Sequence, residues 1–179
     1  MGAAVVMFIA WSNFYVIIGS SAASLTGLMF VVVTLVAGSR LRERTDRNEG
    51  FATFNTPTVV HFCAAFLVAG IVSAPWRSLT PVSVLLGITG LCGVVYVCRV
   101  MYRAKRLTAY QAVAEDWLWH AILPCIDYAA IAASAVLLSC APEQAKFALA
   151  GSTILLIFIG IHNAWDVVTY IAIEQSPDQ

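Results

Sequence analysis

Three histidines and two aspartates lie inside long apolar segments of this chain: His61, His120, Asp127, His162 and Asp166. An ionisable side chain in a lipid bilayer is costly unless it is paired, so each of these residues is a candidate functional group. His162 and Asp166 are four residues apart, so on a helix they share one face and the carboxylate can fix the tautomer of the imidazole. The set therefore predicts a polar site inside an apolar protein.

Three interpretations of this polar set stay open. In the first, the side chains only hold helices together, with Asp127 protonated or bonded to Tyr128 or to a neighbouring hydroxyl. In the second, they line a route for protons or small ions that is entered past Glu115 and Asp116, because an imidazole titrates near neutral pH. This second interpretation requires no cofactor.

In the third interpretation, the chain binds a metal ion or haem and is a membrane oxidoreductase or hydrolase. Zinc, iron and copper accept ligands of this kind. The ligand set would be His61, His120, His162 and Asp166. No tight motif such as HExxH supports such a site, so whether the chain is an enzyme stays open.

Pro124 predicts an irregularity in the helix that carries His120 and Asp127. Proline has no backbone N–H, so the carbonyl four residues earlier, that of His120, loses its helical donor. We expect a kink at this point and a carbonyl that can accept a hydrogen bond from a proton carrier, water or ligand.

The composition is that of an integral membrane protein. Of 179 residues, 60% are apolar and 11% charged, and the mean hydropathy is +0.84, well outside the range of soluble domains. We expect a single transmembrane domain over residues 1–179, an all-α polytopic bundle of about five helices. The predicted spans are 13–38, 57–75, 82–101, 117–141 and 147–171. Residues 1–12 are apolar without a basic leader, so we expect them to extend the first helix.

Eight of the ten basic side chains fall in or beside two connections between spans. They are Arg40, Arg42, Arg44, Arg47, Arg99, Arg103, Lys105 and Arg106. Loops rich in Lys and Arg stay in the cytoplasm, so the amino terminus is predicted outside and the carboxyl terminus inside. Arg99, Arg103 and Arg106 share a helix face suited to anionic lipid headgroups. The net charge is zero and the basic residues form no long patch, so we expect no nucleic-acid partner.

Two stripes of small residues predict close contacts between helices. One is Gly19, Ala23 and Gly27, and the other is Gly87, Gly90 and Gly93. Small residues let transmembrane helices approach closely, so each stripe is typical of a helix–helix contact. Because a chain this small has packing surface to spare, we expect a homo-oligomer or contact with another membrane protein.

Three further features complete the prediction. Thr56 before Pro57 predicts the start of the second span, with a hydroxyl cap and proline at the first helical position, and Pro81 predicts the same for the third. The five tryptophans are expected to anchor the spans at the membrane interfaces. The five cysteines lack CxxC spacing, and most lie in apolar runs, where we expect them to be buried.

Several phrases resemble one group of small bacterial multi-helix membrane proteins of uncharacterised function. They are Trp11-Ser-Asn-Phe-Tyr-Val, Ser21-Ala-Ala-Ser-Leu-Thr-Gly-Leu-Met-Phe-Val, Thr56-Pro-Thr-Val-Val-His, Glu115-Asp-Trp-Leu-Trp-His and Gly160-Ile-His-Asn-Ala-Trp-Asp. The resemblance implies a multi-pass protein of the bacterial inner membrane. It implies no reaction, ligand or catalytic residue. The leading hypothesis is a channel- or transporter-like protein, and the alternatives are the metalloprotein and a structural or regulatory subunit of a larger membrane complex.

Overall fold

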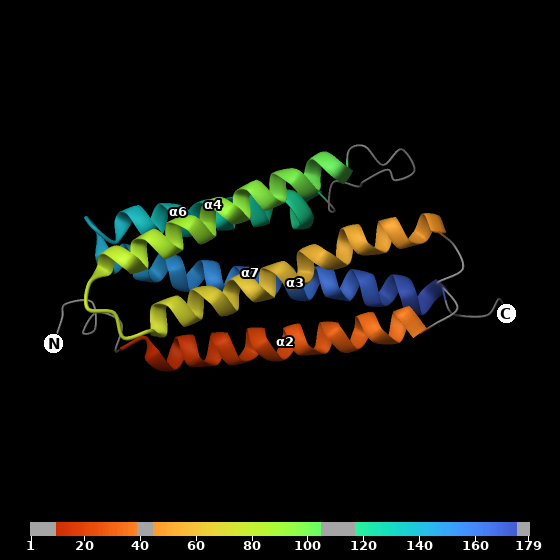
Figure 1. Ribbon diagram of the computed structural model, residues 1–179, viewed down its shortest axis with the longest axis horizontal. Coiled ribbons are helices and arrows are strands. Elements are labelled where there is room, and N and C mark those ends of the chain that lie inside the picture. The colour runs from red at the N-terminus through yellow and green to blue at the C-terminus, as the bar shows by residue number, and fades with distance from the viewer. Residues whose placement is uncertain (1–9, 39–44, 105–116, 175–179) are drawn as a thin grey trace.

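The computed structural model describes residues 10–38, 45–104 and 117–174 (Figure 1). Within these ranges the chain is all-helical. The helices are α2 (Ser12–Gly38), α3 (Thr45–Ser73), α4 (Leu79–Ala104), the π-helical turn η2 (Leu118–Ile122), α6 (Leu123–Leu137) and α7 (Pro142–Glu174). Since η2 continues directly into α6, the described residues contain five helices long and apolar enough to cross a membrane. This number agrees with the five predicted spans.

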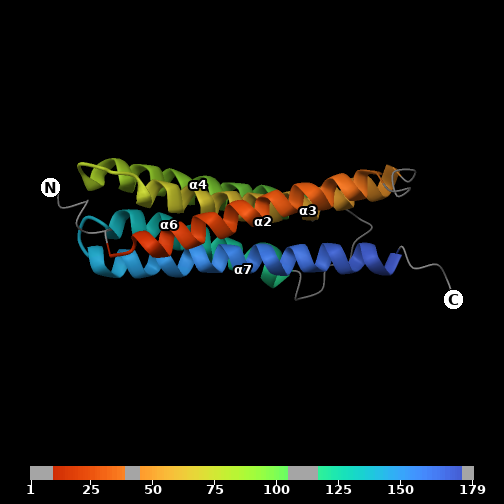
Figure 2. The same cartoon turned by 90° about the horizontal axis from the view of Figure 1, so that it is seen from below.

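The helices lie along one common axis, and successive helices run in opposite directions (Figures 1 and 2). In the middle of the bundle, α3 and α7 pack against each other. On one side α2 covers α3, whereas α6 contacts both α4 and α7. As a result, residues of α3, α6 and α7 that are far apart in the sequence can meet inside the bundle.

The outer surface of the bundle is apolar, and polar side chains lie inside. Large apolar side chains are exposed on every helix, among them Phe30, Leu67, Leu91, Val136 and Phe158. The buried polar or charged side chains of the described residues are Thr58, His61, Asp127, Ser134, Lys146, Ser152, Thr153 and Asn163. An apolar surface this extensive marks contact with lipid, so the fold fits a membrane protein.

The boundaries differ from the prediction mainly at the second span. Because α3 begins at Thr45, Pro57 lies inside the helix and Thr56 is not its N-cap, so that prediction was wrong. An interior proline removes one helical hydrogen bond, which a transmembrane helix tolerates, and the polar residues before it continue the helix. In α4, which begins at Leu79, Pro81 is the third residue rather than the predicted first, although it still lies in the first turn.

Several predicted features lie outside the described residues. Most of the extension over 1–12 is among them, as are Arg40, Arg42, Arg44, Lys105, Arg106, Glu115 and Asp116. The side chain of Arg47 is not described either. Arg99 and Arg103 are exposed near the end of α4 that leads into the second basic connection.

The stripe of glycines in α4 lies against α6. A Cβ atom at Gly87 would lie 3.6 Å from Cβ of Ala135, and one at Gly90 would lie 2.5 Å from the backbone N of Ala132. A Cβ at Gly93 would collide with the ring of Tyr128. Only glycine therefore allows the backbone of α4 to approach α6 this closely at the last two positions.

The stripe predicted in α2 is largely unused inside the described bundle. Gly19 lies near Ala69 of α3, but Ala23 is exposed and a Cβ at Gly27 would meet nothing within 4 Å. The buried face of α2 is formed instead by Tyr15, Ile18, Ala22 and Met29. A rotation by one residue, about 100° on a helix, separates this face from the predicted stripe.

The cysteines also differ from the prediction. Cys63, Cys92, Cys98 and Cys140 are exposed and Cys125 is half-buried, and all five thiols are free. A small apolar thiol suits a lipid-facing surface as well as a core, so an apolar run did not distinguish the two environments.

Candidate functional site

A hydrogen bond between His61 and Tyr128 lies at the centre of the buried polar region. It joins α3 to α6, with 3.0 Å between imidazole Nδ1 and phenol Oη. The rings are tilted by 41°, with centroids 5.7 Å apart. His61 is 0% exposed and Tyr128 1%. The prediction considered Tyr128 only as a partner of Asp127, because nothing in the sequence shows that α3 faces it.

Two glycines make room for this pair. The Tyr128 ring lies over Gly93 of α4, and the ring of Phe62, next to His61 in the sequence, lies over Gly160 of α7. A side chain at either glycine would occupy the space of an aromatic ring. These glycines therefore fix the separation of the helices at the level of the buried pair.

Asp127 lies next to the pair, on α6, and faces α7. It is 1% exposed, and its carboxyl accepts a side-chain hydrogen bond from Ser152. The hydroxyl expected beside Asp127 is thus that of Ser152 rather than that of Tyr128. The second carboxyl oxygen, Oδ2, has no hydrogen-bond partner in the described part of the chain.

Other buried polar atoms also have hydrogen-bonding capacity to spare. Among the described residues, Nε2 of His61 and both side-chain polar atoms of Asn163 lack a partner. A buried polar atom without a hydrogen bond costs about 1–3 kcal/mol, more if it is charged. Water that reaches these atoms would remove that cost, since each site offers more than one polar group.

Four buried polar or charged side chains lie on α7 between Lys146 and Asn163. Lys146 is 6% exposed and lies near the start of the helix, with its Nζ 2.7 Å from Oε1 of Glu143. Ser152, Thr153 and Asn163 continue this line and are buried as well. From Lys146 to Asn163 the helix advances 17 residues, which at 1.5 Å each is about 26 Å. The line therefore spans most of a hydrocarbon core of about 30 Å.

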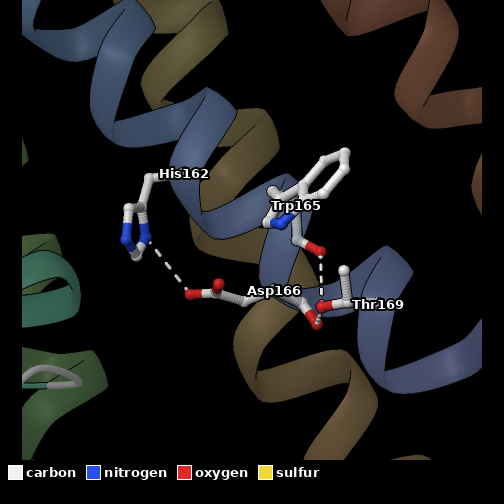
Figure 3. A network of polar contacts seen from close by, with 4 residues as sticks. All are labelled: His162, Trp165, Asp166 and Thr169. Carbon is white, nitrogen blue, oxygen red and sulfur yellow. Dashed lines mark hydrogen bonds and ion pairs between the residues drawn. The ribbon is translucent and has the colours of Figure 1, made fainter. Parts of the chain in front are cut away.

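His162 and Asp166 form a second, separate pair near the carboxyl end of α7 (Figure 3). Nδ1 of His162 lies 3.2 Å from Oδ2 of Asp166, as the spacing of four residues predicts. The hydroxyl of Thr169 donates to the carbonyl of Trp165 at 2.9 Å and lies 3.0 Å from that of Asp166. The side chains of His162 and Asp166 are 28% and 46% exposed, so this pair lies at the edge of the bundle.

Trp119 of η2 stacks on His162. The ring centroids are 3.9 Å apart and the planes differ by 11°. The prediction gave Trp119 the role of an interface anchor, which does not account for this contact.

The irregularity expected from Pro124 takes the form of a π turn. The N–H of Leu123 donates to the carbonyl of Leu118, five residues earlier. This turn contains Trp119 and His120 and directly precedes the proline. Single π turns inside α-helices are frequent at functional sites. Here the turn belongs to the element that carries the indole to His162.

The candidate metal ligands do not converge. His61 pairs with Tyr128 and His162 with Asp166. Over residues 10–38, 45–104 and 117–174, no group of three or more His, Cys, Asp or Glu side chains is placed to hold a metal ion. The described residues thus contain two polar pairs on three helices rather than one ligand set.

The chain matches no known family model, no curated protein and no solved structure. The resemblance to small bacterial membrane proteins therefore stays an expectation, and the site is interpreted from its own geometry.

Proposed function

We propose that this protein is a small channel- or transporter-like protein of the bacterial inner membrane that gives protons or small ions a polar route between its helices. The supporting observation is that His61, Asp127 and Asn163 carry buried polar atoms without a hydrogen-bond partner among the described residues, in a bundle whose outer surface is apolar. In lipid such atoms are costly, so they persist where water or a passing ion completes their bonding.

The proposed route runs along α7. His61, Asp127 and Asn163 lie in its buried part, and the half-exposed pair of His162 and Asp166 lies toward one end. Under the proposed orientation that end faces the cytoplasm, and His120 belongs to the same mouth. Lys146 lies toward the opposite end of the line.

The proposal includes a homo-oligomer and contact with membrane lipids. Ala23 and Gly27 of α2 present a small-residue surface with no use inside the described bundle. Close packing of helices through small residues is a main route to association in lipid. Arg99 and Arg103 are exposed where anionic headgroups would lie.

Ion flux in proteoliposomes tests the proposed function. The full chain is reconstituted, and gradients of protons, K⁺ and Na⁺ are imposed in turn while currents are recorded on a solid-supported membrane. We expect flux above that of empty liposomes for at least one of these ions. Asp127→Asn, which keeps the shape but loses the charge, should lower it.

Ser134→Ala is the matched control. Ser134 is a buried hydroxyl on the same helix, and its hydrogen bond goes to the carbonyl of Ala130 in its own helix. Its loss should leave the flux unchanged. Background currents in all three gradients would contradict the proposed function and favour a structural or regulatory subunit.

A further inference from the structure

We propose that the species carried is the proton, relayed through the hydrogen-bonded pair of His61 and Tyr128, rather than a hydrated ion. This inference rests on the proposed function and names the substrate class of the same route. Its two supports are the packing around the pair and the chemistry of its two side chains.

Aromatic rings pack closely around the pair in the described part of the bundle. The ring of Tyr128 fills the space over Gly93 so closely that a single Cβ there would collide with it, and Phe62 fills the space over Gly160 in the same way. His61, Phe62 and Tyr128 are all at most 1% exposed. An ion with its hydration shell cannot cross at this level without displacing aromatic side chains. A proton can cross, because it moves from group to group.

The donor set also disfavours a bare metal cation. Within the three described ranges no three His, Cys, Asp or Glu side chains are placed to hold one, and the carboxylate beside the pair is the single residue Asp127. Cations such as Na⁺, Ca²⁺ or Mg²⁺ need several oxygen ligands to replace their water. Imidazole and phenol groups, in contrast, exchange protons one at a time.

The pair can transfer a proton with atoms and charge in balance. In the starting state His61 is neutral and carries its proton on Nδ1, which donates to Oη of Tyr128. Nε2 takes up a proton from water, Nδ1 gives its proton to Oη, and the phenol releases its own proton to the next acceptor. One proton enters at Nε2 and one leaves from Oη, and both side chains end neutral. The starting tautomer returns when Nε2 gives its proton back to water on the entry side and water on that side supplies one proton to Nδ1, so the imidazole stays neutral.

Acceptors are available on both sides of the pair. Nε2 of His61 and Oδ2 of Asp127 are buried and have no protein partner in the described structure, so each can bond a water molecule that enters the bundle. Among titratable groups, His120 interacts electrostatically with His61. Those that interact electrostatically with Tyr128 are Asp127, Tyr96 and Cys63. Of these groups, Asp127 directly precedes Tyr128 in the sequence and can accept the proton that the phenol releases.

Two measurements in proteoliposomes test the relay. First, the selectivity of the wild-type protein is measured with a pH-sensitive dye inside the liposomes for protons and with ion-sensitive dyes for K⁺ and Na⁺. Second, Tyr128→Phe removes only the hydroxyl and keeps the ring over Gly93. General acid–base groups contribute about 10²–10⁴-fold to reactions they serve, so we expect proton flux to fall at least about tenfold.

Tyr15→Phe is the matched control. Tyr15 is also 1% exposed, but its hydroxyl, unlike that of Tyr128, has no hydrogen-bond partner among the described residues. Its variant should keep wild-type proton flux. His61→Gln, which keeps hydrogen bonding but cannot carry a proton, should lose flux as Tyr128→Phe does.

The outcomes separate the two proposals. No flux of any ion would overturn the proposed function and this inference together. Flux of K⁺ or Na⁺ comparable to that of protons would overturn the inference alone, and this result needs no variant to fold. Equal proton flux in Tyr128→Phe and Tyr15→Phe would also overturn it.

Discussion

Gly90→Ala should destabilise the bundle because it forces α4 and α6 apart. The new Cβ would lie 2.5 Å from the backbone N of Ala132 and 2.7 Å from the carbonyl oxygen of Tyr128, whereas ordinary contact begins at 3.4 Å. Both obstacles are backbone atoms, so neither can rotate away and the helices must separate by about 0.9 Å, the shortfall from that contact distance. Overpacking of this kind costs about 1–3 kcal/mol.

We expect the upper end of that range, because the backbone cannot yield. The better helix propensity of alanine offsets up to about 1 kcal/mol, which leaves a net loss of about 2 kcal/mol. For a chain of this size that corresponds to a fall in Tm of about 4–8 °C. Tm in detergent can be followed by circular dichroism, and equilibrium unfolding in SDS gives the free energy itself.

Gly151→Ala is the matched control for the same substitution. A Cβ at Gly151, on α7, meets nothing within 4 Å, so this variant should be as stable as the wild type or slightly more so. If Gly90→Ala and Gly151→Ala prove equally stable, the close contact between α4 and α6 is refuted, and with it the placement of Tyr128.

Three further predictions concern the contact between Gly160 and Phe62, the stack of Trp119 on His162, and the orientation in the membrane. Gly160→Ala should destabilise the protein because its Cβ would collide with the ring of Phe62, and adding Phe62→Leu should restore part of the loss; if the second change only adds to the first, the two residues do not touch. Trp119→Leu should lower the unfolding free energy by about 1 kcal/mol, because the stack on the imidazole of His162 is lost. Trp165→Leu, at an exposed position, is the control and should lower it little. Equal losses in the two variants would contradict the stack. A membrane-impermeant thiol reagent should label Cys140, exposed between α6 and α7, from outside intact cells in a variant lacking the other cysteines; labelling only after lysis would reverse the proposed orientation.

Much of the helical framework could be predicted from the sequence. Apolar length alone located the five helices, and the spacing of His162 and Asp166 predicted their contact. Pro124 predicted an irregularity, although the missing donor leads to a π turn rather than to a simple kink. These features depend on residues near each other in the chain, where helix geometry determines which side chains meet.

Contacts between distant helices could not be predicted in this way. The partner of His61 on α6 and the partner of Asp127 on α7 depend on the rotation of each helix about its axis, and an all-apolar helix gives little periodic signal for that rotation. For the same reason, the contact stripe predicted for α2 passed through Ala23, whereas the alanine that is buried in the bundle is Ala22. The helix start predicted at Thr56 and Pro57 was wrong for another reason. A hydroxyl residue followed by proline also fits a helix interior when the preceding residues stay helical.

The central claim is that the buried polar region around His61 exchanges protons with water, and magic-angle-spinning NMR of the full chain in lipid bilayers tests it most directly. The chain contains three histidines, so ¹⁵N-labelled histidine gives signals from three imidazole rings. The signals of His61 are those missing from the spectrum of His61→Gln. We predict transfer of magnetisation from water to the ring nitrogens of His61, although this residue is 0% exposed. A His61 ring that receives none, while half-exposed His162 does, would show a dry core and contradict the proposed route.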